Sequence, residues 1–474
     1  MKTEPKRLLK NFTQGYTFKI LLLIFLVLLL LLSPLTMIRG LIDERSWTAA
    51  SAETEVMSAW GSQLIEAGPV IAIPGIRTVE TVTKTERDGE KTQLAKRPFT
   101  LFVTPKTLNI EAAFKTEIRR RGIFSVPLFS GELTLSGAFN PAAALASLAP
   151  NEELSPAQAE LIIALSSQKG IRKINRALWN NQELFFQPGN RGLNINLRAR
   201  SINSKYDYNS SQAGGGIQAA LPEFTAGETE FDINIAMQGG QLVRFLPLGQ
   251  DTHVEISADW ASPSFQGSFL PGSSTITDSD FNAAWDVSYL SRNIPLFWKS
   301  ENENRDYDGF GDSMFGVNFF RAVDTYSLNT RAVKYAVLFL TVPFLTLFLF
   351  EVLSRKRIHP IPYLLSGIAN IIFYLLLLSL SEQMQFYIAY LIAAFGVTVM
   401  MTLYARSLLP SWDKSWYMGL VVLISYILLY AVLNSESYAL LIGSIGAFAV
   451  VGLVMFLTRK LDWYGSEERE LTNS

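Results

Sequence analysis

The chain contains no cysteine, and among its 474 residues histidine occurs only at His253 and His359. The missing thiols exclude disulfides, thiolate catalysis, iron–sulfur clusters and cysteine-based zinc sites. Two histidines are too few for a multi-histidine metal centre. The net charge of -1 gives no basic surface of the kind that follows nucleic-acid phosphates. We therefore expect no cofactor and no nucleic-acid partner.

Sequence motifs of the common enzyme classes are also missing. The chain has no G-x-S-x-G elbow, no H-E-x-x-H pair, no G-x-x-x-x-G-K phosphate loop and no dinucleotide fingerprint. Serine–histidine catalysis before residue 330 would need His253, which is out of phase with Val254 and Ile256 in an alternating segment. We expect this histidine to face solvent. The sequence predicts no catalytic residue, with a hydrolase as the minor alternative.

Long apolar runs, in contrast, are abundant, and the mean hydropathy is +0.20. The run at 20–38 is long enough to cross a bilayer core. It exceeds the apolar part of a signal peptide, and no A-x-A-like site follows it, so we interpret it as a retained anchor. Five similar runs lie near the C-terminus, at 333–353, 361–381, 385–405, 416–434 and 437–458. The sequence predicts six membrane-spanning helices, one N-terminal and five C-terminal.

The short loops differ in their content of lysine and arginine, which predicts the orientation of the helices. The loops at 381–385 and 434–438 contain neither residue, whereas cations follow the second and sixth spans. These topology-determining cations are Arg355, Lys356, Arg357, Arg459 and Lys460. Residues 1–19 are basic as well. We predict a cytoplasmic N-terminus (1–19), a bundle at 333–458, a cytoplasmic tail (459–474) and an exported segment at 40–330.

The exported segment alternates apolar and polar residues, which is typical of antiparallel strands with one buried face. Alternating apolar positions occur at Ile110, Ala112, Phe114, Ile118, Leu133, Leu135, Phe139, Phe231, Ile233, Ile235, Met237, Val254, Ile256, Ala258 and Trp260. The pair Gly239-Gly240 indicates a hairpin turn. Ser155 and Pro156 predict the start of a helical insertion over about 155–169. The predicted fold is a membrane protein, α plus β, whose exported domain of antiparallel sheets forms one or two subdomains.

Two clusters of charged residues are candidate binding sites. Asn304, Asp306, Asp308 and Asp312, with Gly309 among them, match part of a calcium-binding loop. Phe315 occupies the position of the bidentate glutamate, so a solvated turn is the main alternative. A second cluster, Arg119, Arg120 and Arg121, ends a predicted strand. It is a candidate for binding anions such as phosphates, or it is a solvated turn.

Several stretches resemble the CreD family of bacterial inner-membrane proteins. These are GPVIAIP (68–74), RRRGIFSVPLFSGELTLSGAF (119–139), ADWASPSFQGSFLPG (258–272), YSLNTRAVKYAVLFL (326–340), FEVLSRKRIHPIPYLLSGIANIIFYLLLLSLSE (350–382) and LNSESYALLIGS (433–444). The resemblance runs from the first span to LDWY near the end, and 203–222 and 301–312 match it poorly. It implies a periplasmic location for 40–330, control by a two-component (CreBC-like) system, and links to carbon source, cell-wall stress, β-lactam response and colicin tolerance. It supplies no catalytic residues.

Two functions remain open from the sequence. The first is a non-enzymatic envelope-stress protein whose exported domain binds an envelope protein or polymer, held by helices whose partner is the lipid bilayer. The second is an activity centred on the bundle, such as passage of a lipid or small molecule, or intramembrane chemistry, with the domain as a lid. Polar residues in mid-span are few, for example Asn370 and Ser425. A polar pair at this depth favours the second function.

Overall fold

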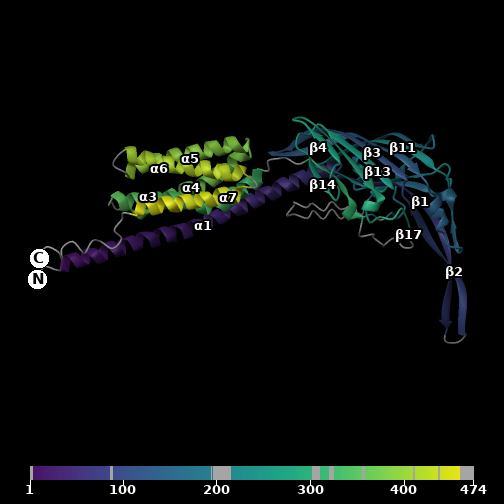
Figure 1. Cartoon of the computed structure of the whole chain (residues 1–474), viewed down its shortest axis with the longest axis horizontal. Coiled ribbons are helices and arrows are strands. Elements are labelled where there is room, and N and C mark those ends of the chain that lie inside the picture. The colour runs from purple at the N-terminus through teal and green to yellow at the C-terminus, as the bar shows by residue number, and fades with distance from the viewer. Residues whose placement is uncertain are drawn as a thin grey trace. The chain divides into compact units, whose positions relative to one another are not determined.

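The computed structural model describes residues 4–85, 89–193, 195, 215–300, 310–319, 325–354, 358–408, 412–435 and 438–459. The chain divides into two compact units. The helical unit comprises Met1–Ala49 and Val323–Ser474, and the β-rich unit comprises Ala50–Ala322. Figure 1 shows helices α3 to α7 in the first and the strands in the second.

Within the described residues, six helices are long and apolar enough to cross a membrane. They are α1 (Glu4–Trp60), α3 (Thr325–Ser354), α4 (Pro360–Ser381), α5 (Phe386–Leu408), α6 (Trp412–Asn434) and α7 (Ala439–Thr458). The arrangement of one N-terminal and five C-terminal spans confirms the prediction. Helix α1, at 57 residues, continues well past the expected end at 38. Residues 41–60 contain neither glycine nor proline and are rich in alanine and glutamate, so nothing ends the helix before Gly61.

One apolar core holds α1, α3, α4, α5 and α6 together. Glycine favours close approach at one point, because a Cβ at Gly367 of α4 would overlap Leu31 Cδ1 of α1. Helix α7 is apolar on all sides and differs from the others in being largely uncovered. A helix of this kind in a membrane is covered by lipid on its free faces.

The strands form two sheets. Sheet A contains β1 (Leu64–Thr85), β2 (Gly89–Val103), β5 (Glu152–Leu154), β6 (Glu160–Leu165), β9 (Gln187–Pro188), β10 (Gly215–Ala220), β12 (Leu242–Leu246), β14 (Ser264–Gly267), β17 (Phe297–Ser300) and β18 (Phe315–Asn318). Sheet B contains β3 (Thr107–Arg121), β4 (Phe124–Phe139), β7 (Ile171–Trp179), β8 (Gln182–Glu183), β11 (Thr229–Gly240), β13 (Asp251–Ala258), β15 (Ser273–Ile276) and β16 (Phe281–Ser288). A five-residue helix, α2 (Ala142–Ala146), follows β4.

Antiparallel pairing dominates both sheets, as predicted, and the described exceptions are the parallel pairs β1–β12 and β3–β13. Sheet B is ordered β15-β16-β13-β3-β4-β11-β7-β8. Alternate residues of both sheets meet in one apolar core. The predicted inward positions Ile110, Leu133, Ile235 and Val254 are fully buried there. Ile118 is the exception, at 54% exposure, because it lies near the free end of β3.

The predicted helical insertion at 155–169 is wrong. Two short 3₁₀ turns, Pro156–Gln158 and Gln168–Gly170, are the helical parts of this range, and Ser155 makes no side-chain capping hydrogen bond. Residues Glu160–Leu165 form strand β6, which pairs with β1 on one side and β10 on the other. The run LIIAL is buried throughout because both faces of β6 are covered. A continuous apolar run does not distinguish a buried strand from a helix, so the capping signals misled the prediction.

The predicted hairpin at Gly239-Gly240 is also wrong, because β11 belongs to sheet B and β12 to sheet A. The chain crosses between the sheets at Gln241, whose φ is 64°. The glycines instead permit close packing. A Cβ at Gly239 would lie 2.6 Å from Phe129 Cζ, and one at Gly240 would lie 2.9 Å from Met57 Cγ.

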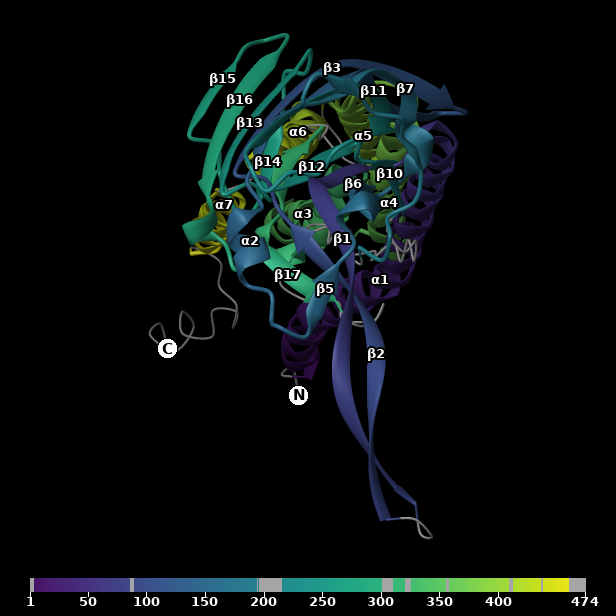
Figure 2. The same cartoon turned by 90° about the vertical axis from the view of Figure 1, so that its right-hand side faces the viewer.

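Strands β1 and β2 extend beyond the rest of the β-rich unit as a two-stranded ribbon, which Figure 2 shows projecting from it. At the base of the ribbon, Gly75–Arg77 of β1 pairs with β5 and Thr100–Val103 of β2 pairs with β17. The β1–β2 pairing itself continues to Thr85 and Gly89. Among the described residues, no third strand pairs with this outer part of the ribbon.

Candidate functional site

The outer face of sheet B is polar, and β13 shows why. Thr252, Val254 and Ile256 point into the core, so Asp251 and His253 must point outward. This confirms the predicted direction of His253. Neighbouring strands place polar residues in register with it, since His253 is paired with Asn109 of β3 and with Asp286 of β16.

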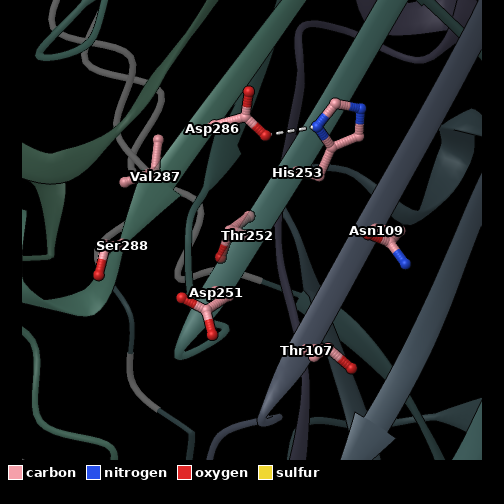
Figure 3. Close-up of a pocket in the computed structure, with 8 residues that line it drawn as sticks. All are labelled: Thr107, Asn109, Asp251, Thr252, His253, Asp286, Val287 and Ser288. Carbon is pink, nitrogen blue, oxygen red and sulfur yellow. Dashed lines mark hydrogen bonds and ion pairs between the residues drawn. The ribbon is translucent and has the colours of Figure 1, made fainter.

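These strands form an open pocket of about 320 Å³. Figure 3 shows the residues that line it, which come from β3, β13 and β16. They are Thr107, Asn109, Asp251, Thr252, His253, Asp286, Val287 and Ser288. We call this the sheet B pocket. Its lining offers carboxylate, amide, hydroxyl and imidazole groups, so it suits a ligand that forms hydrogen bonds.

The closest polar contact in the sheet B pocket joins His253 Nδ1 to Asp286 Oδ1, at 2.7 Å. The His253 side chain is 43% exposed and that of Asp286 is 82% exposed. A carboxylate at Nδ1 favours the tautomer with hydrogen on Nδ1, which leaves Nε2 as an acceptor. Because water screens so exposed a pair, the contact adds little to the stability of the fold. Its main effect is to orient the His253 ring.

The pocket also contains a serine, Ser288, near His253. Ser288 pairs in register with Asp251, two positions along β13 from His253. Among the described residues, no hydrogen bond joins a serine hydroxyl to His253, so the pocket lacks the serine–histidine contact that activates a nucleophile. The arrangement presents donors and acceptors to a ligand without an activated nucleophile.

The polar row through the pocket continues across sheet B. Asn109 pairs in register with Ser136 of β4, and Ser136 pairs with Asp232 of β11. The carboxylate of Asp232 accepts a hydrogen bond from Arg176 of β7 at 2.8 Å. The pocket is therefore one part of a polar surface that spans several strands. These partners were not predicted from the sequence, because they come from segments far apart in the chain.

The arginine cluster at the end of β3 is largely engaged within the β-rich unit. The Arg119 guanidinium lies 3.7 Å from the ring centroid of Trp60 at the end of α1, and its Nε donates to Glu117 at 2.8 Å. Arg121 pairs with Glu55 of α1 at 2.5 Å. Two of the three cations thus fix the last turns of α1 to the sheet. Arg120 is exposed, and anion binding at this cluster stays a prediction.

Most of the calcium-loop and topology candidates lie outside the described residues, namely Asn304, Asp306, Asp308, Arg355, Lys356, Arg357 and Lys460. Asp312 is described; it is exposed on a short helical turn, Gly311–Ser313. Arg459 lies 4.0 Å from the ring centroid of Phe456. Across the described part of the chain, no group of three His, Asp or Glu side chains is placed to hold a metal ion.

A buried polar network lies inside the helical unit. Tyr426 of α6 donates its hydroxyl hydrogen to Asn370 Oδ1 of α4 at 3.0 Å. Tyr390 of α5 donates to the carbonyl of Tyr426 at 2.6 Å, and Asn370 Nδ2 donates to the carbonyl of Ser366 at 2.8 Å. Phe373 packs against both tyrosines. The network joins three helices near the middle of α4, and the sequence indicated only its Asn370 member.

Two carboxylates of the helical unit, Glu382 and Glu351, lie at helix ends. Glu382 follows α4 and binds Arg45 at 3.0 Å and the Tyr326 hydroxyl at 3.1 Å. Glu351, in the last turn of α3, accepts from the Tyr363 hydroxyl at 2.8 Å and from the backbone N–H of Ile358 at 3.2 Å. These contacts tie neighbouring helices together near the ends of their apolar spans.

Comparison with known proteins agrees with the observed architecture. A family model described as "Inner membrane protein CreD" matches residues 15–464. The chain is also 31% identical to the inner membrane protein CreD of Escherichia coli strain K12 over 443 residues, which cover 93% of this chain and 92% of that relative. Six apolar helices, a β-rich domain and an alignment over nearly the whole length together establish that the chain belongs to the CreD family of inner membrane proteins.

Proposed function

We propose that this CreD-family protein is a non-enzymatic, envelope-stress protein that maintains the integrity of the cell envelope. Its β-rich unit binds an envelope protein or polymer, and its helices hold that unit at the inner membrane. The observation that carries the proposal is the sheet B pocket, in which Asp286 and His253 are exposed and oriented toward each other. The family resemblance supports control by a two-component system.

The chemistry of the pocket favours a ligand with hydroxyl or ammonium groups. Asp251 and Asp286 supply acceptor oxygens, His253 Nε2 supplies another acceptor in the favoured tautomer, and Asn109 supplies both a donor and an acceptor. Net acidity of this lining disfavours an anionic ligand. Binding of this kind needs no nucleophile or metal ion, which agrees with a non-enzymatic function.

A periplasmic location of the β-rich unit is part of the proposal. Lysine and arginine lie before the apolar run of α1, between α3 and α4, at the facing ends of α5 and α6 (Arg406 and Lys414), and after α7, which favours a cytoplasmic position for both termini. With an even number of spans, the segment between α1 and α3 then lies on the opposite side of the membrane from both termini.

The test is rescue of a strain that lacks its own CreD-family gene and is stressed with a β-lactam or a detergent. The variant carries His253→Ala with Asp286→Ala in the full chain. We expect it to reach the membrane at normal levels but to leave survival at the level of the deletion strain. Ser274→Ala, on an exposed position of β15 outside the pocket, is the matched control and should rescue fully. Full rescue by the double variant would refute the proposal.

The network of Asn370, Tyr390 and Tyr426 favours a second candidate, an activity centred on the bundle. Polar groups at membrane depth often line the path or site of a transported or reacting molecule. In the same rescue assay, this candidate predicts that the double variant Asn370→Leu with Tyr426→Phe fails to restore survival. The variant His253→Ala with Asp286→Ala should then restore it. The opposite pattern supports the binding proposal.

A further inference from the structure

Glu66 is a carboxylic side chain placed inside the main core of the β-rich unit. It lies on β1 between Leu165 of β6 and Phe245 of β12, with which it is paired in register. Both of those neighbours belong to the core between the sheets, as does Leu64 two positions earlier. Glu66 has 0% exposure, and neither of its carboxylate oxygens has a hydrogen-bond partner among the described residues.

The strands packed around Glu66 bring no charge to it. The core-facing residues are Leu161, Ile163 and Leu165 on β6, Val243 and Phe245 on β12, and Ile235 and Met237 on β11, which packs against β1 from sheet B. None of these side chains titrates. The basic residues on or next to these strands form hydrogen bonds with groups other than Glu66.

Arg244 of β12 is in register with Ile65, so it lies on the opposite face of sheet A, where it donates to Gln266 at 3.1 Å. Arg292 donates to the carbonyl oxygens of Leu248 and Gly249. Lys169, which follows β6, donates to the carbonyl of Ser58 at 3.3 Å. Glu66 therefore has no counter-ion within the described structure.

An isolated carboxylate is strongly disfavoured in apolar surroundings, whereas a neutral carboxylic acid is tolerated at a smaller cost. Burial accordingly raises the pKa of Glu66 well above its ordinary value of 4.5. The folded unit holds this side chain in its protonated form over a pH range in which the unfolded chain has already released the proton.

We propose that Glu66 is a pH-sensitive switch that loosens the packing of β1 against β6 and β12 as pH rises. When β1 opens, the carboxyl O–H bond breaks, the proton passes to water, and the carboxylate becomes hydrated. Closing the strand reverses each step. The sign follows from linkage: the stabilisation is fully present below the unfolded pKa and is lost as pH rises through the raised folded pKa. The switch adds to the proposed binding function and does not depend on it.

The test is amide hydrogen exchange of the full chain in detergent micelles, followed in peptides that cover 63–72 and 160–166. After correction for the intrinsic effect of pH on exchange, the opening constant of these segments should rise at least about tenfold between pH 5 and pH 7. The limit for a single proton is about tenfold per pH unit. Glu66→Gln replaces the ionisable carboxyl group with a neutral amide of similar shape. The corrected opening constant of this variant should therefore not change with pH.

Glu66→Met provides a second variant of similar length if the amide disturbs folding. The measured quantity is the change of the opening constant with pH, not its value at one pH. A variant that is merely less stable overall would raise the opening constant at every pH and leave this slope unchanged. The matched control is Glu153→Gln, an exposed carboxylate on β5, which should keep the wild-type slope. Equal slopes in the wild-type chain and in both Glu66 variants would overturn the proposal.

Discussion

At the residue scale, Glu152 shows how a buried carboxylate is stabilised when partners are present. It accepts hydrogen bonds from Arg77 Nε at 2.8 Å, from Lys299 Nζ at 2.6 Å and from the backbone N–H of Ala149 at 2.9 Å. Burial alone would raise the pKa of Glu152, but the contacts with Lys299, Ala149 and Arg77 outweigh it and lower the pKa to about 2. The ionised carboxylate therefore stabilises the folded unit.

Glu152→Gln should lower the free energy of unfolding by about 3–4 kcal/mol at pH 7, because the pKa falls from 4.5 to about 2 and each pKa unit is worth about 1.4 kcal/mol. A lowered pKa contributes stability above the unfolded value of 4.5, which is lost as pH falls through about 2. The difference between variant and wild type should thus shrink by more than half at pH 3. Denaturant titrations followed by tryptophan fluorescence at the two pH values check this.

Glu153→Gln, one residue along β5, is the control and should change the free energy of unfolding by less than about 0.5 kcal/mol, because Glu153 is exposed. If the free energy of unfolding of Glu152→Gln differs from that of the wild type by the same amount at both pH values, the stabilisation by Glu152 is not electrostatic. Neither Glu66 nor Glu152 was predictable from the sequence. Each depends on which strands lie beside it, and register is not encoded in composition or local period.

At the element scale, the last turns of α1 are fixed to the β3–β4 hairpin. Trp60 stacks with Arg119 and donates its indole N–H to the carbonyl of Phe129, and Met57 packs against Val126 and Leu128. Trp60→Ala removes the ring from these contacts. We expect it to increase exchange of amides in 50–60 by about tenfold or more, equivalent to at least about 1.4 kcal/mol.

Trp60→Phe keeps an aromatic face for Arg119 and is the matched control. It should retain most of the protection while losing the hydrogen bond to Phe129. Hydrogen exchange of the full chain measures both variants under the same conditions. Unchanged protection in Trp60→Ala would show that the helix end is held by Met57 and its neighbours instead.

Local patterns predicted some elements better than others for a physical reason. Strands with one covered face, such as β11 and β13, alternate visibly and were predicted correctly. Strand β6 is covered on both faces, so it shows no alternation, and the signals at Ser155 and Pro156 suggested a helix. In the candidate site, His253 was expected to face outward, but Asp286 lies 33 residues further along and was not associated with it.

At the scale of the whole molecule, hydropathy predicted all six spans because lipid imposes a minimum apolar length that folding details do not alter. The extent of α1 was underestimated. Beyond its apolar run the helix continues through residues of ordinary helix propensity and ends in contacts with the β3–β4 hairpin, neither of which a search for apolar runs detects. The division at Ala50 and Ala322 likewise follows tertiary packing rather than the edge of the first span.

The side of the membrane on which the β-rich unit lies can be tested with single cysteines, since the natural chain has none. Ser274 is exposed on β15, and Ser407 is exposed in the last turn of α5. In spheroplasts, a membrane-impermeant maleimide should label Ser274→Cys at once. It should label Ser407→Cys only after permeabilisation, because Arg406 and Lys414 favour a cytoplasmic position for that end of α5. The unsubstituted chain is the blank, and labelling of Ser407→Cys in intact spheroplasts would reverse the proposed orientation.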